Sequence, residues 1–238
     1  MRSLRPLRSL RFALAAASLI ATTAFATPAD PKNGADYVTL ATPQPTQVVG
    51  KKVEVIEFFM YHCPACNALE PHLQAWVKKQ GDNILFKRVH LPYTGPNDPE
   101  AHLHLTLEAM GKSEEFSPKV FRAVHIERIR LSKDDAIIEW VGKNGIDKAK
   151  FLEYWNSFGV LTKLKRAPTV LSNYRVDGVP SIVVDGRYMT SPSTVSQANP
   201  SYPQTQLYEA TQQVLDALVA KVAKEKAAVA PAAAKTSK

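Results

Sequence analysis

The 238-residue sequence has very few cysteines, which narrows the chemistry open to it. Only Cys63 and Cys66 are present, so there is no second Cys-x-x-Cys pair, and no His-x3-His pair accompanies them. A structural zinc site needs four such ligands, so a zinc-binding domain is not favoured. A bridge between cysteines this close together closes a very short loop and removes little entropy from the unfolded chain. A purely structural disulfide is therefore not favoured either.

The sequence also lacks an apolar run at its N-terminus that is long enough to span a bilayer. The run over residues 12–25 is too short for that and follows a basic segment. Ala24-Phe25-Ala26 matches the small-x-small cleavage pattern, with no cysteine at the cleavage point as a lipoprotein would need. We expect residues 1–26 to be a secretory signal peptide cleaved after Ala26. Export would place both cysteines where disulfides persist, in a bacterial periplasm.

The body of the chain carries no net charge. The formal charge is +8, but residues 1–26 contribute +4 and the segment from Lys221 onward contributes another +4. We therefore expect no nucleic-acid partner. The Ala-, Pro- and Lys-rich residues 225–238 are predicted to be a disordered tail. There is no internal repeat, and the roughly 190 residues between signal and tail suffice for one core or one core with an inserted subdomain.

The two cysteines lie where a strand pattern gives way to a helix pattern. Residues 53–60 are apolar at both parities, which is typical of a strand buried on both faces. Pro64 then suits the first position of a helix. Cys63 and Cys66 would share one face of the first turn, close enough to bridge. Because unpaired N–H groups and the helix dipole favour a thiolate at a helix N-terminus, Cys63 is predicted to be a reactive, redox-active cysteine.

Glu57 places a carboxyl group within that strand. It shares a face with Val53, Val55 and Phe59, so the alternation predicts that its side chain points inward. A buried carboxyl without a full partner has a raised pKa and can exchange protons. The alternative is a carboxylate paired with a lysine, and Lys87 in the next predicted strand is the candidate partner.

The rest of the sequence alternates between patterns typical of helices and patterns typical of strands. Trp140, Phe151, Trp155 and Phe158 recur at helical spacing and are interpreted as core residues. Pro180 stands where a strand would need a ladder N–H, which suggests a cis Val179-Pro180 bond. The predicted elements are a helix over 64–79, a strand over 84–91, helices within 98–174, a hairpin after Pro180, a polar loop over 191–203 and a helix over 204–224.

This order of elements resembles the DsbA family of periplasmic thiol oxidases. The specific carriers are Glu57-Phe58-Phe59, Cys63-Pro64-Ala65-Cys66 and Gly178-Val179-Pro180-Ser181. The resemblance implies an α/β protein with a thioredoxin-like fold and an inserted helical domain. The expected units are a first thioredoxin-like part over 27–97, the helical insertion over 98–174 and a second thioredoxin-like part over 175–224.

The resemblance also implies roles for individual residues. Cys63 is the exchanging cysteine and Cys66 the buried resolving one. Pro180, after Val179, is the cis-proline that faces them. Glu57 is the buried acid, and Lys87 is the lysine that accompanies it. The redox-active disulfide takes the place of a cofactor, and no metal is expected.

One position departs from the family pattern. DsbA proteins usually carry histidine where this chain has Ala65, between Pro64 and the second cysteine. Without that imidazolium we expect a less depressed pKa for Cys63 and a less oxidising disulfide. His62, just before Cys63, either compensates in part or lies on the surface. The sequence does not decide how far Ala65 shifts the reduction potential.

The expected function is that of a monomeric periplasmic protein that donates its disulfide to newly exported, reduced proteins. The family implies reoxidation by a quinone-linked membrane protein of DsbB type. A disulfide isomerase, which would need a dimerisation module, and a reductase are the enzymatic alternatives. A peptide-binding chaperone with a merely structural disulfide is the alternative from another class, and a metal carrier is a more distant one. The sequence does not identify the substrates or the reoxidant.

Overall fold

A computed structural model describes residues 28–48 and 50–233 of the chain. The predicted signal peptide, residues 1–26, lies outside the described residues, as do residues 234–238 of the predicted tail. None of the described helices is both long enough and apolar enough to span a membrane.

A five-stranded mixed sheet forms the centre of the molecule, in the order β1-β5-β4-β2-β3. The strand that precedes the cysteines, β2, is central and buried along its whole length, as its apolar residues at both parities predict. It runs parallel to β3 and antiparallel to β4, and β3 forms one edge of the sheet. The strands are β1 (Val38–Thr39), β2 (Val53–Phe59), β3 (Ile84–His90), β4 (Ser181–Val184) and β5 (Tyr188–Thr190).

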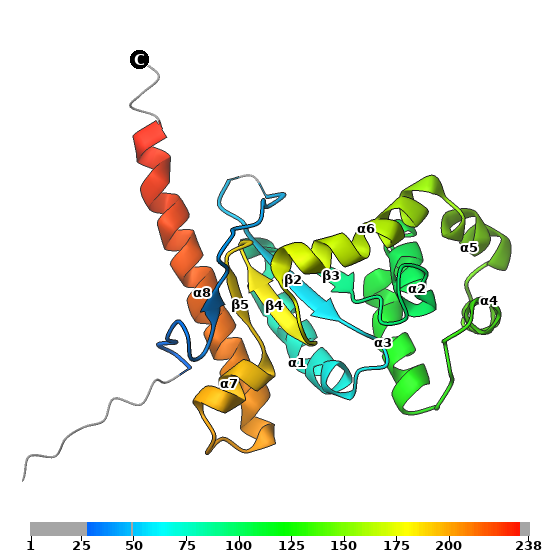
Figure 1. Ribbon diagram of the computed structural model, residues 1–238, viewed down its shortest axis with the longest axis horizontal. Coiled ribbons are helices and arrows are strands. Elements are labelled where there is room, and N and C mark those ends of the chain that lie inside the picture. Colours follow the sequence, from blue (N-terminus) through cyan, green and yellow to red (C-terminus); the bar gives the residue numbers. More distant parts are fainter. Residues whose placement is uncertain (1–27, 49, 234–238) are drawn as a thin grey trace, which may run out of the picture.

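Helices cover both faces of the sheet and gather at one end of it (Figure 1). Five of them, α2 to α6, occupy the chain between β3 and β4, where the helical insertion was predicted. Whether they form a domain of their own stays a prediction. The helices are α1 (Pro64–Gln80), the 3-10 helix η1 (Gly81–Asn83), α2 (Pro99–Ala109), α3 (Ser113–His125), α4 (Asp134–Lys143), α5 (Lys148–Trp155), α6 (Phe158–Tyr174), α7 (Pro192–Ala198) and α8 (Gln204–Ala233).

Three apolar clusters divide the interior. In the first, α1 and α8 pack on one face of the sheet through residues such as Leu73 and Val214. In the second, α6 packs on the other face, where Tyr174 lies against Phe58. The third cluster joins the end of β2 to helices α2–α5 and contains both cysteines. The two cysteines are therefore held between the sheet and the helical segment.

Three sequence predictions about the fold are wrong. Phe158 is 86% exposed, because it begins a new helix capped by Ser157 and does not continue the apolar stripe. The polar loop over 191–203 contains α7, whose N-cap is Ser191. The serine and proline at its start were interpreted as loop residues, because both residue types favour loops as well as helix starts.

The third error concerns residues 225–233 of the predicted disordered tail, because α8 extends to Ala233. Alanine and lysine favour helices, so a low-complexity composition does not exclude one. Side chains on this stretch also bind the turn between β4 and β5. Glu225 pairs with Arg187 at 2.8 Å, and Lys226 pairs with Asp185 at 2.7 Å.

Candidate functional site

Cys63 is the N-cap residue of α1, as the sequence predicts. Its Sγ accepts a hydrogen bond of 3.4 Å from the backbone N–H of Cys66, and Pro64 occupies the start of the helix. The Cys63 residue is 9% exposed, whereas Cys66 is fully buried. A thiol of another molecule can therefore reach only the first sulfur, and Ala65, exposed beside it, adds no side-chain donor to the site.

The environment separates the acidities of the two thiols. Hydrogen bonds from the Cys66 thiol and from the backbone N–H groups of Cys66 and Ala65 outweigh burial and lower the pKa of Cys63 to about 6. The charge of His62 acts in the same direction. The bond with Cys63, followed by burial, strongly raises the pKa of Cys66. One cysteine is therefore a thiolate at neutral pH and the other a thiol.

This difference predicts a pH-dependent stability of the reduced protein. An unfolded thiol has a pKa of roughly 8.5, whereas the hydrogen bonds to Cys63 lower its pKa to about 6 in the fold, against the effect of burial. Between these values the unfolded chain binds more protons, so stability rises with pH, and the contribution disappears below pH 6. We expect reduced parent protein to gain stability over Cys63→Ser between pH 5 and pH 8 in urea unfolding. A difference that does not change with pH would contradict the assignment.

The loop before β4 faces the reactive sulfur. The Val179-Pro180 peptide bond is cis, which confirms the sequence prediction. In its thiol form Cys63 donates a hydrogen bond of 3.6 Å from Sγ to the carbonyl oxygen of Val179. The structure thus brings together Cys63, Cys66, Val179 and Pro180 from distant parts of the sequence.

Glu57 is fully buried, as the strand alternation predicts. Burial raises its pKa to about 7, although Arg88 opposes the shift. Its Oε2 accepts a hydrogen bond of 2.8 Å from Nε of Arg88, while its Oε1 has no hydrogen-bond partner in the described part of the chain. The charge of Cys63 also raises the pKa of Glu57, and the charge of Glu57 raises the pKa of Cys66.

The predicted partner of Glu57 is wrong. Lys87 Nζ binds Oε2 of Glu54 at 2.6 Å, and Arg88 takes the position beside Glu57. The strand register is the cause, because Glu57 lies opposite Arg88 and Ile56 opposite Lys87. Side chains of adjacent residues in a strand point to opposite faces, so Lys87 and Glu57 lie on different sides of the sheet.

Arg88 also binds a second carboxylate. Its Nη1 and Nη2 donate to the two oxygens of Glu70 on α1, at 3.1 Å and 2.7 Å. The Arg88 side chain is only 9% exposed, so two carboxylates share one buried cation. No sequence pattern pointed to Glu70, although the residue lies two turns along the helix that Cys63 caps.

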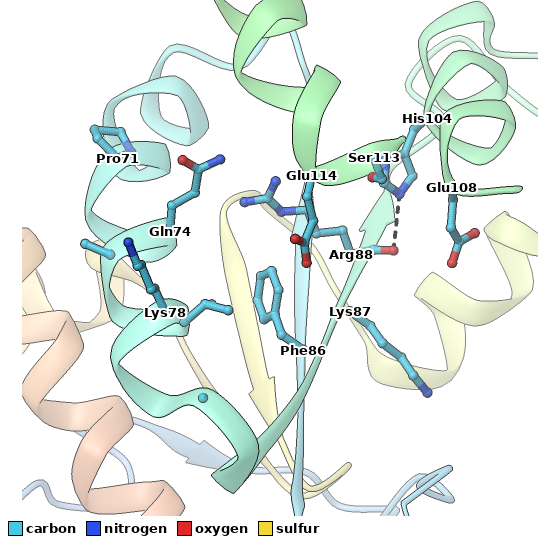
Figure 2. Close-up of a pocket in the computed structure, with 13 residues that line it drawn as sticks. Pro71, Gln74, Lys78, Phe86, Lys87, Arg88, His104, Glu108, Ser113 and Glu114 are labelled. Atoms are coloured by element: carbon cyan, nitrogen blue, oxygen red, sulfur yellow. Dashed lines mark hydrogen bonds between the residues drawn. The ribbon is translucent and has the colours of Figure 1, made fainter. Parts of the chain in front are cut away.

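A groove of about 860 Å³ lies beside this ion cluster, along the edge strand β3. Figure 2 shows its walls, which come from α1, β3, α2 and α3. At one end His104 Nε2 lies 3.3 Å from the carbonyl oxygen of Arg88, on the edge of the sheet. The cysteines do not line this groove, and no sequence pattern predicted it.

Two histidines, one buried and one half-buried, hold the turn between β2 and the cysteines. The backbone N–H of Tyr61 donates to Nε2 of His90 at 3.0 Å, and Nε2 of His125 donates to the carbonyl oxygen of Tyr61 at 2.8 Å. Both histidines fix the backbone immediately before the reactive cysteine.

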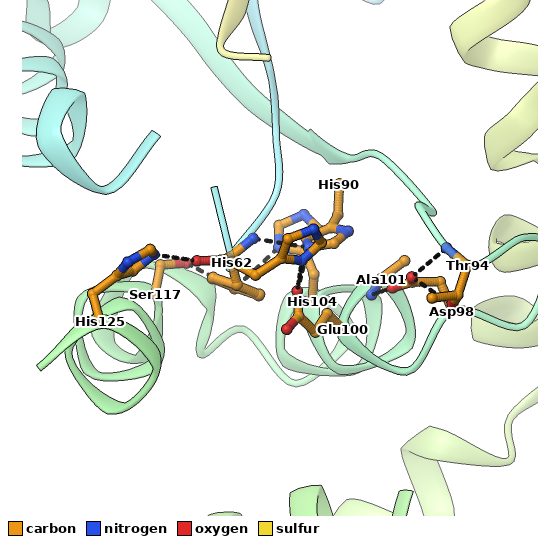
Figure 3. Close-up of polar contacts among 10 residues, drawn as sticks. His62, His90, Thr94, Asp98, Glu100, Ala101, His104, Ser117 and His125 are labelled. Carbon is orange, nitrogen blue, oxygen red and sulfur yellow. Dashed lines mark hydrogen bonds and ion pairs between the residues drawn. The ribbon is translucent and has the colours of Figure 1, made fainter. Parts of the chain in front are cut away.

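No sequence pattern marks Glu100 as a residue of the site. Figure 3 shows its side chain directed at His62, and Oε2 lies 2.6 Å from His62 Nδ1. The only available signal was an acidic residue in the first turn of the helix that Asp98 caps, and that signal is explained equally well by the helix dipole. The structure thus provides a partner for the histidine that precedes Cys63.

Comparisons with known proteins agree with this geometry. A family model described as "DSBA-like thioredoxin domain" matches residues 97–200. The thiol:disulfide interchange protein DsbA of Burkholderia cepacia is 40% identical over 208 residues, covering 87% of this chain and 93% of that protein. The protein of the same name from Bordetella pertussis is 40% identical over 179 residues, covering 75% and 85%.

Solved structures show the same architecture. The crystal structure of Pseudomonas aeruginosa DsbA matches with a TM-score of 0.72 and 32% identity, over 84% of this chain and 97% of that one. The oxidoreductase NmDsbA1 from N. meningitidis matches with a TM-score of 0.68 and 26% identity, over 82% and 95%. The expected thioredoxin-like fold is confirmed.

Proposed function

From the premise that this chain belongs to the DsbA family and is a thiol:disulfide oxidoreductase, we propose that it donates a Cys63–Cys66 disulfide to newly exported proteins. One observation carries the proposal: a reachable cysteine with a pKa lowered to about 6 stands beside a fully buried one. A disulfide whose reduced form contains a stabilised thiolate is a strong oxidant. The family uses a redox-active disulfide rather than an external cofactor.

The exchange proceeds in two steps. A client thiolate attacks Sγ of Cys63, the Cys63–Cys66 bond breaks, and its electron pair leaves on Cys66. Because the pKa of Cys66 is raised, this sulfur takes up a proton. A second client thiolate then attacks the client sulfur of the mixed disulfide and expels Cys63 as a thiolate. The client loses two electrons, and the protein gains them.

Neighbouring groups are assigned supporting roles in this scheme. Glu57, whose pKa burial raises to about 7, exchanges the proton that Cys66 takes up or releases. The Val179-Pro180 segment faces Cys63 and offers backbone to an extended client chain. Lys87 has no role here, because its ammonium group binds Glu54 on the other face of the sheet.

The remaining assignments follow from the family and the sequence. We place the mature protein in the periplasm, after cleavage behind Ala26, as a monomer that a DsbB-type membrane protein reoxidises. We assign two segments, residues 27–97 and 175–224, to the thioredoxin-like domain. Residues 98–174 form the inserted helical domain in this assignment. An isomerase would instead form a stable dimer in size-exclusion chromatography. A chaperone of this fold would suppress aggregation equally well after alkylation of its thiols.

The reduction potential of the cysteine pair tests the proposal. We expect a value between roughly −120 and −180 mV, the range from DsbA to protein disulfide isomerase, because the Cys63 thiolate is stabilised without a histidine at position 65. The measurement is the equilibrium of the mature protein with glutathione, with the thiols counted by alkylation and mass. A potential near roughly −270 mV, that of thioredoxin, would show a reductase or a structural disulfide and would refute the proposal.

A further inference from the structure

Helix α2 contributes a buried carboxylate to the neighbourhood of the reactive cysteine. Glu100 Oε2 lies 2.6 Å from Nδ1 of His62, and His62 immediately precedes Cys63. The Glu100 side chain is 10% exposed and that of His62 is 37% exposed, so the pair is partly shielded from water. Charged pairs interact more strongly where water is partly excluded.

We propose that Glu100 is a positioning residue for thiol-disulfide exchange, which holds His62 as an imidazolium beside Cys63 and so replaces the cation absent at Ala65. The inference rests on the proposed function and identifies a residue that makes the disulfide more oxidising. Glu100 touches neither the sulfur nor a client, and it acts only through His62.

Among the groups around this pair, His62 is the one that donates a hydrogen bond to Glu100. His90 Nε2 is 3.7 Å from Glu100 Oε2, farther than the 2.6 Å to His62, and this nitrogen accepts the Tyr61 N–H. The ring of Tyr93 packs against His62 edge-on, with centroids 5.3 Å apart. His62 is therefore held on one side by a carboxylate and on another by an aromatic ring.

The start of α2 fixes Glu100 in place. Asp98 caps this helix, with Oδ1 accepting the N–H of Ala101 at 2.8 Å. Its Oδ2 accepts both the N–H and the hydroxyl of Thr94, at 3.0 Å and 2.8 Å (Figure 3). These bonds occupy the Asp98 carboxylate, so its charge reaches His62 only through space. Glu100 lies in the same first turn, so the capped start of the helix also fixes the direction of its side chain.

The acidities of the two partners agree with an ionised pair. The hydrogen bond with Glu100 raises the pKa of His62 against burial, and the charges of Asp98 and Cys63 add to it. Burial raises the pKa of Glu100, but the bond with His62 and the presence of His90 outweigh burial and lower it to about 2. The charge of His62 is one of the causes that lower the pKa of Cys63.

The test is the Glu100→Gln variant in the glutathione equilibrium. Glutamine keeps the size of the side chain but removes its charge, so His62 loses its proton at a lower pH. The thiolate of Cys63 is then less stable and the disulfide less oxidising. We expect the equilibrium constant for oxidation of glutathione to fall about tenfold, which corresponds to about 30 mV for a two-electron couple. The His62 pKa, followed by NMR, and the Cys63 pKa, followed by thiolate absorbance, shift in opposite directions.

A matched control removes the same charge from the same helix. Glu108 lies on α2 and pairs with Lys163 at 3.0 Å, with side chains 43% and 59% exposed. Glu108→Gln is expected to leave the glutathione equilibrium unchanged. His62→Asn, at a partly exposed position, is expected to reproduce the tenfold decrease, and it supplies the measurement should Glu100→Gln fail to fold.

The double variant separates positioning from general structural damage. In the His62→Asn background, Glu100→Gln should have no further effect on the equilibrium, because it acts only through that histidine. An undiminished effect there, or parental equilibrium constants in both Glu100→Gln and His62→Asn, would overturn the inference. If the parent protein has an oxidising potential and Glu100→Gln does not change it, this inference fails and the proposed function stands. A parent protein without an oxidising potential would refute the function itself.

Discussion

Replacing Cys63 with serine is expected to reduce the oxidation of unfolded, reduced ribonuclease to the rate seen in buffer. A serine hydroxyl cannot form or leave a disulfide, and the remaining Cys66 is fully buried. Loss of the exchanging nucleophile removes at least ~10³-fold in rate. The measurement is the recovery of ribonuclease activity with oxidised protein in excess. Oxidation at the parental rate would show that another group carries the exchange.

Cys66→Ser is the matched variant for this experiment. It is equally unable to complete oxidation, but it keeps the reachable Cys63 with its helix N-terminal donors. Given a client that carries a mixed disulfide with a small thiol, it should accumulate a covalent complex that disappears on reduction. Cys63→Ser should accumulate none. A complex on both variants, or on neither, would contradict the assignment of attacking and resolving cysteines.

Arg88→Met is expected to cause the largest loss of stability among single changes near the site. Methionine roughly keeps the volume of the side chain but leaves Glu57 and Glu70 without their shared cation. Removal of one partner from a buried ion cluster costs about 3–5 kcal/mol. The loss should be largest at pH 8 and smaller at pH 5, because burial raises the pKa values of both carboxyl groups and protonation removes their charge. Urea unfolding at both pH values measures it.

Arg122→Met is the control for this substitution. Arg122 pairs with Glu127 at 3.0 Å, but the side chains are 71% and 43% exposed. Water screens such a pair, so the same chemical change should cost less than about 1 kcal/mol. Equal losses at positions 88 and 122 would show that the cluster around Arg88 does not depend on its buried charge.

The redox centre is predictable from sequence because its determinants are neighbours in the chain. The apolar strand over 53–59, Pro64 and the two cysteines define a strand, a helix start and a sulfur at its N-terminus. Local geometry then determines the hydrogen bond from Cys66 N–H to Cys63 Sγ. The strand alternation also places Glu57 inside. None of these inferences needs to know how distant parts of the chain pack.

The partner of Glu57 was not predictable, because it depends on the register between two strands. Lys87 and Arg88 are adjacent cations, and only the pairing of β2 with β3 decides which of them shares a face with Glu57. A shift by one residue would exchange their positions. Hydrophobic alternation does not settle this register, since β2 is buried on both faces.

Glu100 is harder still to predict. It lies 38 residues from His62 in the sequence, and their contact requires α2 to pack against the turn before Cys63. The pattern indicates that α2 exists and where it begins. It does not indicate against which part of the sheet the first turn rests, because several apolar faces compete for that position.

The edge strand β3 has a consequence for a protein that works among unfolded chains. An edge with free backbone groups recruits other extended segments, which leads to aggregation. Two adjacent cations, Lys87 and Arg88, lie on this edge, and His104 occupies the carbonyl oxygen of Arg88. Charges along an edge strand oppose further pairing. In the proposed function, clients meet the protein at the loop beside Cys63, and the charges on β3 oppose the pairing of extended client segments with this edge.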